Sequence, residues 1–184
     1  MNRLISAGLA GVLSVALALP AAAHTGHAGD AMFVQGLLHP LTGIDHLLAM
    51  VAVGVWAAQN GGRALWLLPA AFIAMLSGGA ALGMAGIALP AVEAGIAASV
   101  AVLGLLVLLN KRVPATAAAL LVGAFAVLHG HAHGTEMPQT ADPLLYGLGF
   151  VLSTALLHGT GIALGLARHL PRRLLAPRAL QRPE

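Results

Sequence analysis

Histidine supplies most of the metal-binding chemistry available to this chain. The sequence holds nine histidines, six acidic residues and no cysteine. Imidazole and carboxylate without thiolate suit borderline divalent cations such as Ni²⁺, Co²⁺, Zn²⁺ and Cu²⁺, whereas an all-carboxylate set would suit Mg²⁺ or Ca²⁺. A chain without cysteine has no disulfide, zinc–thiolate site or thiol nucleophile. Any metal site in this protein must therefore use nitrogen and oxygen ligands.

The first group of ligand-type residues is His39, Asp45 and His46, within an eight-residue stretch. On a regular helix, His39 and His46 are about 700° apart, which places them within about 20° of the same face and two turns apart. Asp45 lies about 100° from His46 on the same helix. Pro40 and Gly43 can loosen this geometry. Three ligand-type side chains so close together predict a metal site.

The second group is the run His129-Gly130-His131-Ala132-His133-Gly134-Thr135-Glu136. If the run is helical, His129 and His133 share a face and His131 points away. If the glycines let the chain extend, all three imidazoles alternate onto one side. At least two histidines converge in either case. Glu136 is as readily a ligand as a solvated carboxylate.

The remaining candidates stand alone or near a chain end. His158 lies inside the last apolar segment, as a ligand or as a hydrogen-bond partner between helices. Glu93 is an interfacial residue or a ligand, and His24 and His27 form either an outer metal-capture arm or a terminus without a site. The predicted metal ligands are thus His39, Asp45, His46, His129, His131, His133, Glu136 and His158, with His24, His27 and Glu93 as weaker candidates.

The composition shows what must position these side chains. Of the 184 residues, 59% are hydrophobic and only 8% are charged, and the mean hydropathy is +0.89. A soluble domain carries about a quarter of its residues as charged side chains. The basic residues are too few and too scattered to line a nucleic-acid groove. The sequence therefore predicts an all-α polytopic membrane helix bundle in contact with the lipid bilayer.

The order of apolar and polar stretches predicts the domain organisation. Residues 1–23 have the charged, apolar and small-residue parts of a secretory signal peptide, although an uncleaved membrane anchor has the same pattern. We expect a periplasmic, histidine-containing N-terminus over 24–35, a five-helix transmembrane domain over 36–167 and a basic cytoplasmic tail over 168–184. The five apolar segments are 36–58, 64–85, 91–109, 114–128 or slightly beyond, and 143–167.

The basic residues predict the orientation of these helices. With residue 24 outside, eight Lys and Arg residues fall on the inner side and none on the outer side. Short cytoplasmic loops carry this positive excess, so we expect a multi-pass inner-membrane protein with a periplasmic N-terminus and a cytoplasmic C-terminus. If the 39–46 stretch, the 129–136 run and His158 face one another, their polar side chains form a series of positions from the outer surface inward.

Three stretches of the chain resemble the HupE/UreJ family of hydrogenase- and urease-associated nickel permeases. They are the 39–50 run that opens with His39 and contains Asp45-His46, the 129–136 run, and Leu157-His158-Gly159. The resemblance spans essentially the whole chain, and Leu128 departs from it, because the family is more often aromatic there. It implies nickel uptake, with cobalt transport in some relatives, and a metal path through His39, Asp45, His46 and the 129–136 run.

We therefore predict a secondary permease that imports Ni²⁺, or Co²⁺, from the periplasm for hydrogenase or urease maturation. The only lysine, Lys111, lies in a short loop without a phosphate-binding motif, so ATP hydrolysis is not expected. We expect no enzymatic activity and no prosthetic group, with the metal as substrate and a cytoplasmic metallochaperone as a candidate partner. Two alternatives stay open. One is an intramembrane metalloenzyme, although the His-Glu-x-x-His motif is lacking, and the other is a metal-sensing or accessory protein.

Overall fold

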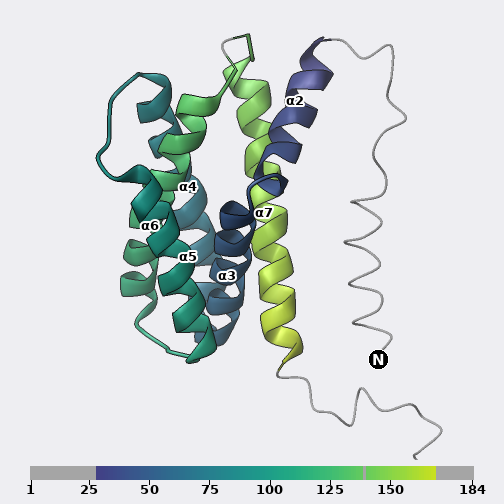
Figure 1. The fold of residues 1–184 in the computed structure, drawn as a ribbon. Coiled ribbons are helices and arrows are strands. Elements are labelled where there is room, and N and C mark those ends of the chain that lie inside the picture. Colours follow the sequence, from purple (N-terminus) through teal and green to yellow (C-terminus); the bar gives the residue numbers. More distant parts are fainter. Residues whose placement is uncertain (1–27, 139, 169–184) are drawn as a thin grey trace, which may run out of the picture. The chain divides into compact units, whose positions relative to one another are not determined.

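The computed structural model describes residues 28–138 and 140–168, and all regular structure in these residues is helical. The elements in chain order are α2 (Ala28–Leu38), the 3₁₀ turn η1 (His39–Leu41), α3 (Ile44–Asn60), α4 (Ala64–Met84), α5 (Val92–Leu108), α6 (Ala115–Glu136) and α7 (Pro143–Ala167) (Figure 1). The predicted all-α class is thus confirmed. The predicted signal peptide, His24, His27 and all of the basic tail after Arg168 lie outside the described residues.

Three of these helices are long and apolar enough to cross a membrane. They are α4, α6 and α7, with 21, 22 and 25 residues. A bilayer core about 30 Å thick needs about 20 helical residues, and α5 has 17. The chain from Asp30 to Leu41 and helix α3 pass the same test only as a pair, bent by 78°. The described residues thus fit a membrane protein with three candidate spans, or four with the bent pair.

The apolar segment expected over 36–58 is not one continuous helix. Pro40 lies in the 3₁₀ turn η1, and Gly43 is extended, with φ −96° and ψ 116°. Proline has no backbone N–H to continue a helical hydrogen-bond ladder, and an extended residue marks the start of a new helix. At this start, the Asp45 carboxylate accepts a hydrogen bond from the His46 backbone N–H at 2.7 Å. The break therefore separates His39 from His46 and sets His46 in the first turn of α3.

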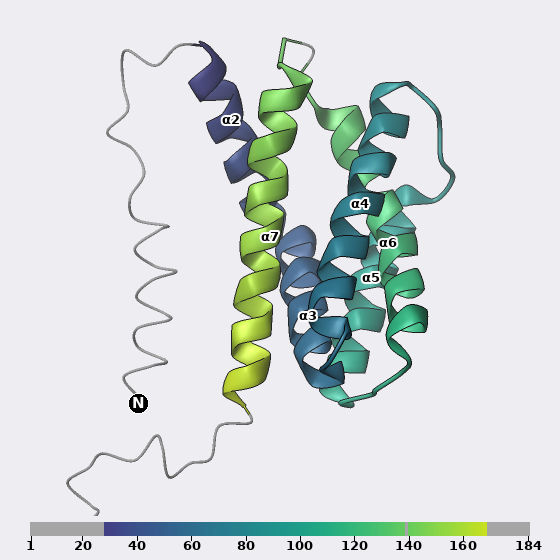
Figure 2. The ribbon, with the colours of Figure 1, turned by 180° about the vertical axis from the view of Figure 1, so that it is seen from behind.

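Glycines allow the backbones of two helix pairs to approach closely. An added Cβ at Gly79 of α4 would collide with the backbone of Val127 in α6. The same holds for Gly54 of α3 against α7, and for Gly161 of α7 against α3. In lipid, where hydrophobic burial does not drive helix association, small residues of this kind allow close van der Waals packing. The bundle thus contains two tightly packed pairs, α4 with α6 and α3 with α7 (Figure 2).

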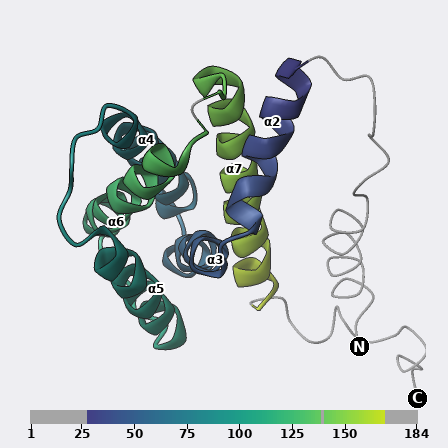
Figure 3. The same cartoon turned by 45° about the horizontal axis from the view of Figure 1, so that its top comes forward.

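Helix α3 lies at the centre of the bundle. With the top of the bundle tilted forward, α7 lies on one side of α3 and α4, α5 and α6 lie on the other (Figure 3). Met50, Val53 and Trp56 of α3 are fully buried in the apolar core. At the far end of α3, the Trp56 indole N–H donates to the Lys111 backbone carbonyl at 2.7 Å. This contact and the core packing hold α3 against α5 and the α5–α6 connection.

Replacing Gly79 with alanine should destabilise the bundle, because its new methyl group meets the α6 backbone. Overpacking of this kind costs about 1–3 kcal/mol. The adjacent Gly78 offers a matched control, since a Cβ there meets nothing within 4 Å. We expect Gly79→Ala to lower the melting temperature in detergent and Gly78→Ala to leave it unchanged. Equal melting temperatures for the two variants would contradict the close α4–α6 packing.

Candidate metal site

Four histidines from three elements converge at one place, which we call the histidine cluster. His39 Nε2 lies 2.8 Å from His133 Nδ1. His133 Nε2 lies 2.7 Å from His46 Nε2. His46 Nδ1 lies 3.0 Å from His129 Nδ1. The four imidazoles therefore form a continuous chain of nitrogen contacts from η1 through α6 and α3 and back to α6.

Local structure explains why these side chains meet. Helix α6 continues through Glu136, so His129 and His133 are four residues apart on one helical face. The helical alternative for the 129–136 run is thus confirmed. His46 stands in the first turn of α3, and η1 presents His39 to the same face of α6. His39 of η1 and His46 of α3 therefore assemble against the face of α6 that carries His129 and His133.

Burial increases along the cluster from one end to the other. Glu136 has the most exposed side chain, at 58% of its full accessibility, and its Oε2 lies 3.6 Å from His39 Nε2 and 3.5 Å from His133 Nδ1. His39 and His133 are partly buried, whereas His46 and His129 retain 2% and 0% exposure. The site thus opens at Glu136 and closes at His129.

The spacing of the ligand atoms fits a borderline divalent cation at the open end. One ligand atom from each of His39, His133 and Glu136 lies within 4.8 Å of the other two. Two nitrogens bound to one tetrahedral metal at about 2.0–2.1 Å are about 3.3 Å apart. The 2.8 Å contact between His39 and His133 would need to widen only slightly. Two imidazoles and a carboxylate form the nitrogen and oxygen set that suits Ni²⁺, Co²⁺ or Zn²⁺.

Three other predicted ligands lie near the cluster or away from it. Asp45 is half-buried at the start of α3, where its carboxylate binds the His46 backbone rather than an imidazole. His131 points away from the cluster, because its Nε2–H donates to the Ile87 carbonyl at 2.7 Å. Glu93 is exposed in the first turn of α5. The structure therefore brings His39, His46, His129, His133 and Glu136 together, and it does not bring His131 or Glu93 to them.

His158 occupies a separate, deeper position on α7. Its side chain is 1% exposed, and neither ring nitrogen has a hydrogen-bond partner among the described residues. The Phe72 ring lies edge-on to it, with centroids 5.0 Å apart and an interplanar angle of 82°. Phe72 also lies 6.1 Å from His129. An aromatic side chain thus contacts both the buried end of the cluster and the unpartnered His158.

Sequence reasoning missed several residues that contact the cluster. Ser99 Oγ of α5 lies 2.7 Å from His129 Nε2. The Phe150 ring of α7 lies 4.7 Å from His133 and within 6.0 Å of both His39 and His46. Phenylalanine in an apolar helix gives no distinguishing signal. A lone serine within an apolar helix does give one, because a polar group at membrane depth needs a partner.

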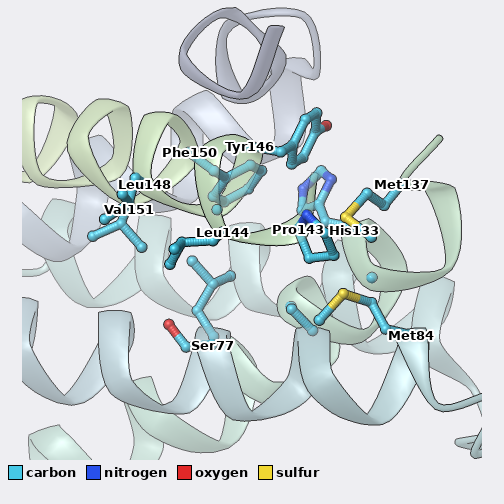
Figure 4. Close-up of a pocket in the computed structure, with 15 residues that line it drawn as sticks. Ser77, Met84, His133, Met137, Pro143, Leu144, Tyr146, Leu148, Phe150 and Val151 are labelled. Carbon is cyan, nitrogen blue, oxygen red and sulfur yellow. The ribbon is translucent and has the colours of Figure 1, made fainter. Parts of the chain in front are cut away.

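An apolar pocket of about 270 Å³ between α4, α6 and α7 reaches the cluster at His133. Its walls include Met84, Met137, Tyr146 and Phe150, which surround the His133 imidazole (Figure 4). Almost all of this lining is hydrocarbon or thioether. The His133 ring therefore has the histidine cluster on one side and an apolar wall on the other, which limits access of water from the pocket side.

Comparisons with known proteins agree with the motifs. The chain matches over residues 12–180 the model of a family described as HupE / UreJ protein. A curated relative, Protein HupE of Rhizobium leguminosarum bv. viciae, is 49% identical over 155 residues, which cover 83% of this chain and 81% of the relative. No solved structure matches the chain with statistical significance. Because both matches extend over most of its length, the chain belongs to the HupE/UreJ family.

Proposed function

We propose that this protein is an inner-membrane permease that imports Ni²⁺ or Co²⁺ through the histidine cluster. The observation that carries the proposal is the graded burial of the ligands, from Glu136 at 58% exposure to His129 at 0%. The family is associated with nickel and cobalt transport for hydrogenase and urease, and the imidazole–carboxylate set fits both metals. The metal is the substrate in this proposal, and the chain needs no prosthetic group.

The geometry favours stepwise transfer over permanent binding. Permeation requires sites that are strong enough to admit an ion and weak enough to release it to the next site. His39, His133 and Glu136 form the outer site, and His46 and His129 receive the ion from them. His133 contacts both His39 and His46, and His46 contacts both His133 and His129. The ion can therefore exchange one imidazole ligand at a time. Asp45 adds a carboxylate beside His46, where it accepts a hydrogen bond from the His46 backbone N–H.

The arrangement of the bundle supports five membrane crossings, with the histidine cluster towards the periplasmic end. In this topology the bent α2–α3 pair forms one span, and α5, whose 17 residues extend about 26 Å, forms a short one. The α3–α4 and α5–α6 connections and the end of α7 lie at one end of the bundle (Figure 1). Arg63, Lys111, Arg112 and Arg168 lie in these segments. Positive charge marks the cytoplasmic side, so the C-terminus is cytoplasmic and Glu136 faces the periplasm.

The membrane potential can drive this import without a nucleotide. An inside-negative potential contributes about 2.3 kcal/mol per charge per 100 mV, and hence about 4.6 kcal/mol for a dication. That energy corresponds to roughly a thousandfold accumulation. Because the proposed site faces the positive side of the potential, the membrane potential favours inward movement of a cation that passes the cluster.

His158 is the next candidate ligand on the proposed path. A buried imidazole without partners is costly in a membrane protein and commonly marks a functional site, and the Phe72 ring lies close to both this imidazole and His129. In the proposed path a cation that moves from His129 to His158 passes the Phe72 ring. This arrangement divides the path into an outer binding region and an inner site behind an aromatic side chain.

The His46→Ala variant should lose metal uptake. His46 contacts both His129 and His133, so its removal interrupts the path at its centre. We expect nickel uptake, measured with radiolabelled Ni²⁺ in cells lacking other nickel importers, to fall at least about tenfold. His131→Ala is the matched control, since His131 faces Ile87, and it should retain uptake. Normal uptake by a well-expressed His46→Ala protein would refute the proposed path.

The His158→Ala variant should separate binding from transport. The outer site does not include His158, so purified His158→Ala protein should bind Ni²⁺ with unchanged affinity. Flux into liposomes should nevertheless fall about tenfold or more, because the ion has no ligand beyond Phe72. Unchanged flux would remove His158 from the path. If the unmodified protein bound nickel without any flux, the accessory metal-binding alternative would replace transport.

A further inference from the structure

A single serine links helix α5 to the histidine cluster. Ser99 is fully buried, and apart from Glu93 in the first turn it is the only side chain of α5 that can donate or accept a strong hydrogen bond. Its Oγ lies 2.7 Å from the Ile96 carbonyl oxygen and 2.7 Å from His129 Nε2. This one hydroxyl therefore contacts both its own helix backbone and the most deeply buried member of the cluster.

The two short contacts determine where the protons lie. A serine hydroxyl has one hydrogen, and a carbonyl oxygen can only accept. Two oxygens 2.7 Å apart without a hydrogen between them would repel each other, so the Ser99 hydroxyl donates to Ile96. The equally short contact to His129 then needs a hydrogen from the other side. His129 must supply it, with its Nε2–H donating to Ser99 Oγ.

This assignment fixes the opposite edge of the His129 ring. In a neutral imidazole one nitrogen carries the hydrogen and the other carries a lone pair. With the hydrogen on Nε2, the lone pair is on Nδ1, which lies 3.0 Å from His46 Nδ1 inside the cluster. The hydrogen bond made by one ring nitrogen of a metal-binding histidine commonly selects the other as the ligand.

We propose that Ser99 is a positioning residue that holds His129 in its Nε2–H tautomer and presents Nδ1 to the metal ion. The inference rests on the proposed function, because it takes His129 as a ligand. It also gives α5 a role in the site. This helix contributes no histidine, yet it holds the deepest imidazole in the orientation and tautomer in which it can accept the ion.

Ser99→Ala should weaken metal binding without removing a ligand. Loss of an outer-shell partner of a metal-binding histidine typically costs 10–100-fold in affinity. We expect the dissociation constant for Ni²⁺ at the His46–His129 site, resolved by titration of the full-length purified protein, to rise about tenfold. Ser99→Thr keeps the hydroxyl and should recover most of the affinity. Ser77→Ala is the matched control, because the Ser77 hydroxyl makes a similar bond within its helix, to Ile73, and contacts no imidazole.

Nitrogen-15 NMR of histidine-labelled, metal-free protein tests the tautomer directly. His129→Ala identifies the His129 signals by their loss. The unmodified protein should show a protonated Nε2 and an unprotonated Nδ1 at His129, and Ser99→Ala should show a mixture of the two tautomers. This comparison decides the matter even if Ser99→Thr does not fold.

The two measurements distinguish failure of the inference from failure of the proposed function. An unchanged His129 tautomer together with unchanged nickel affinity at the His46–His129 site in Ser99→Ala would overturn the positioning role, while His129→Ala would still lose binding at that site if the proposed path is right. Full nickel affinity at the His46–His129 site in His129→Ala would overturn both, because His129 would then not be a ligand.

Discussion

The cost of burying imidazoles away from water governs this structure. A polar side chain at membrane depth must find a partner, a bound ion or a water-filled space. His46 and His129, at 2% and 0% exposure, satisfy this requirement through other imidazoles and Ser99. Such contacts can form only if η1, α3, α5 and α6 adopt one relative arrangement. The same contacts therefore specify the packing of this half of the bundle and assemble the candidate ligands.

Close backbone packing makes this arrangement accessible. The α4–α6 pair approaches through Gly79, and the α3–α7 pair through Gly54 and Gly161. Bulkier residues at these positions would push α6 away from α4 and α7 away from α3, and so displace helices that carry members of the cluster and its neighbours. The glycines thus act on the site indirectly. They contribute no ligand, but they set the helix separations at which nitrogen atoms of different helices meet near 3 Å.

Parts of the site follow from sequence periodicity, and other parts require tertiary structure. The spacing of His129 and His133 predicts their common face, because it needs only a helix. His39 and His46 also join one cluster, but not as neighbours on a regular helix, since Pro40 and Gly43 break that helix with a 78° bend and each histidine contacts His133 instead. Ser99 lies 30 residues from His129, and no local pattern relates an α5 serine to an α6 histidine. Similarly, the spacing within α6 shows that His131 faces away from His129 and His133. Only the fold shows that the His131 Nε2–H donates to the Ile87 carbonyl.

The apolar core below His158 bears on how an ion would complete its passage. Towards the end of the bundle that carries Arg63 and Lys111, Trp56 and Leu68 are fully buried. An ion that left His158 in this conformation would meet mostly hydrocarbon side chains there, with Gln59, whose Oε1 has no partner among the described residues, as a buried polar group farther along, and desolvation in such surroundings is costly. Transport by the proposed path therefore requires the helices to move so that the inner end opens. The two tightly packed pairs, α3–α7 and α4–α6, are the natural rigid units for such a movement, with Phe72 and the histidine cluster at their junction. The proposed import would then be that of a carrier that alternates between conformations, because a permanently open channel would need a continuous polar lining.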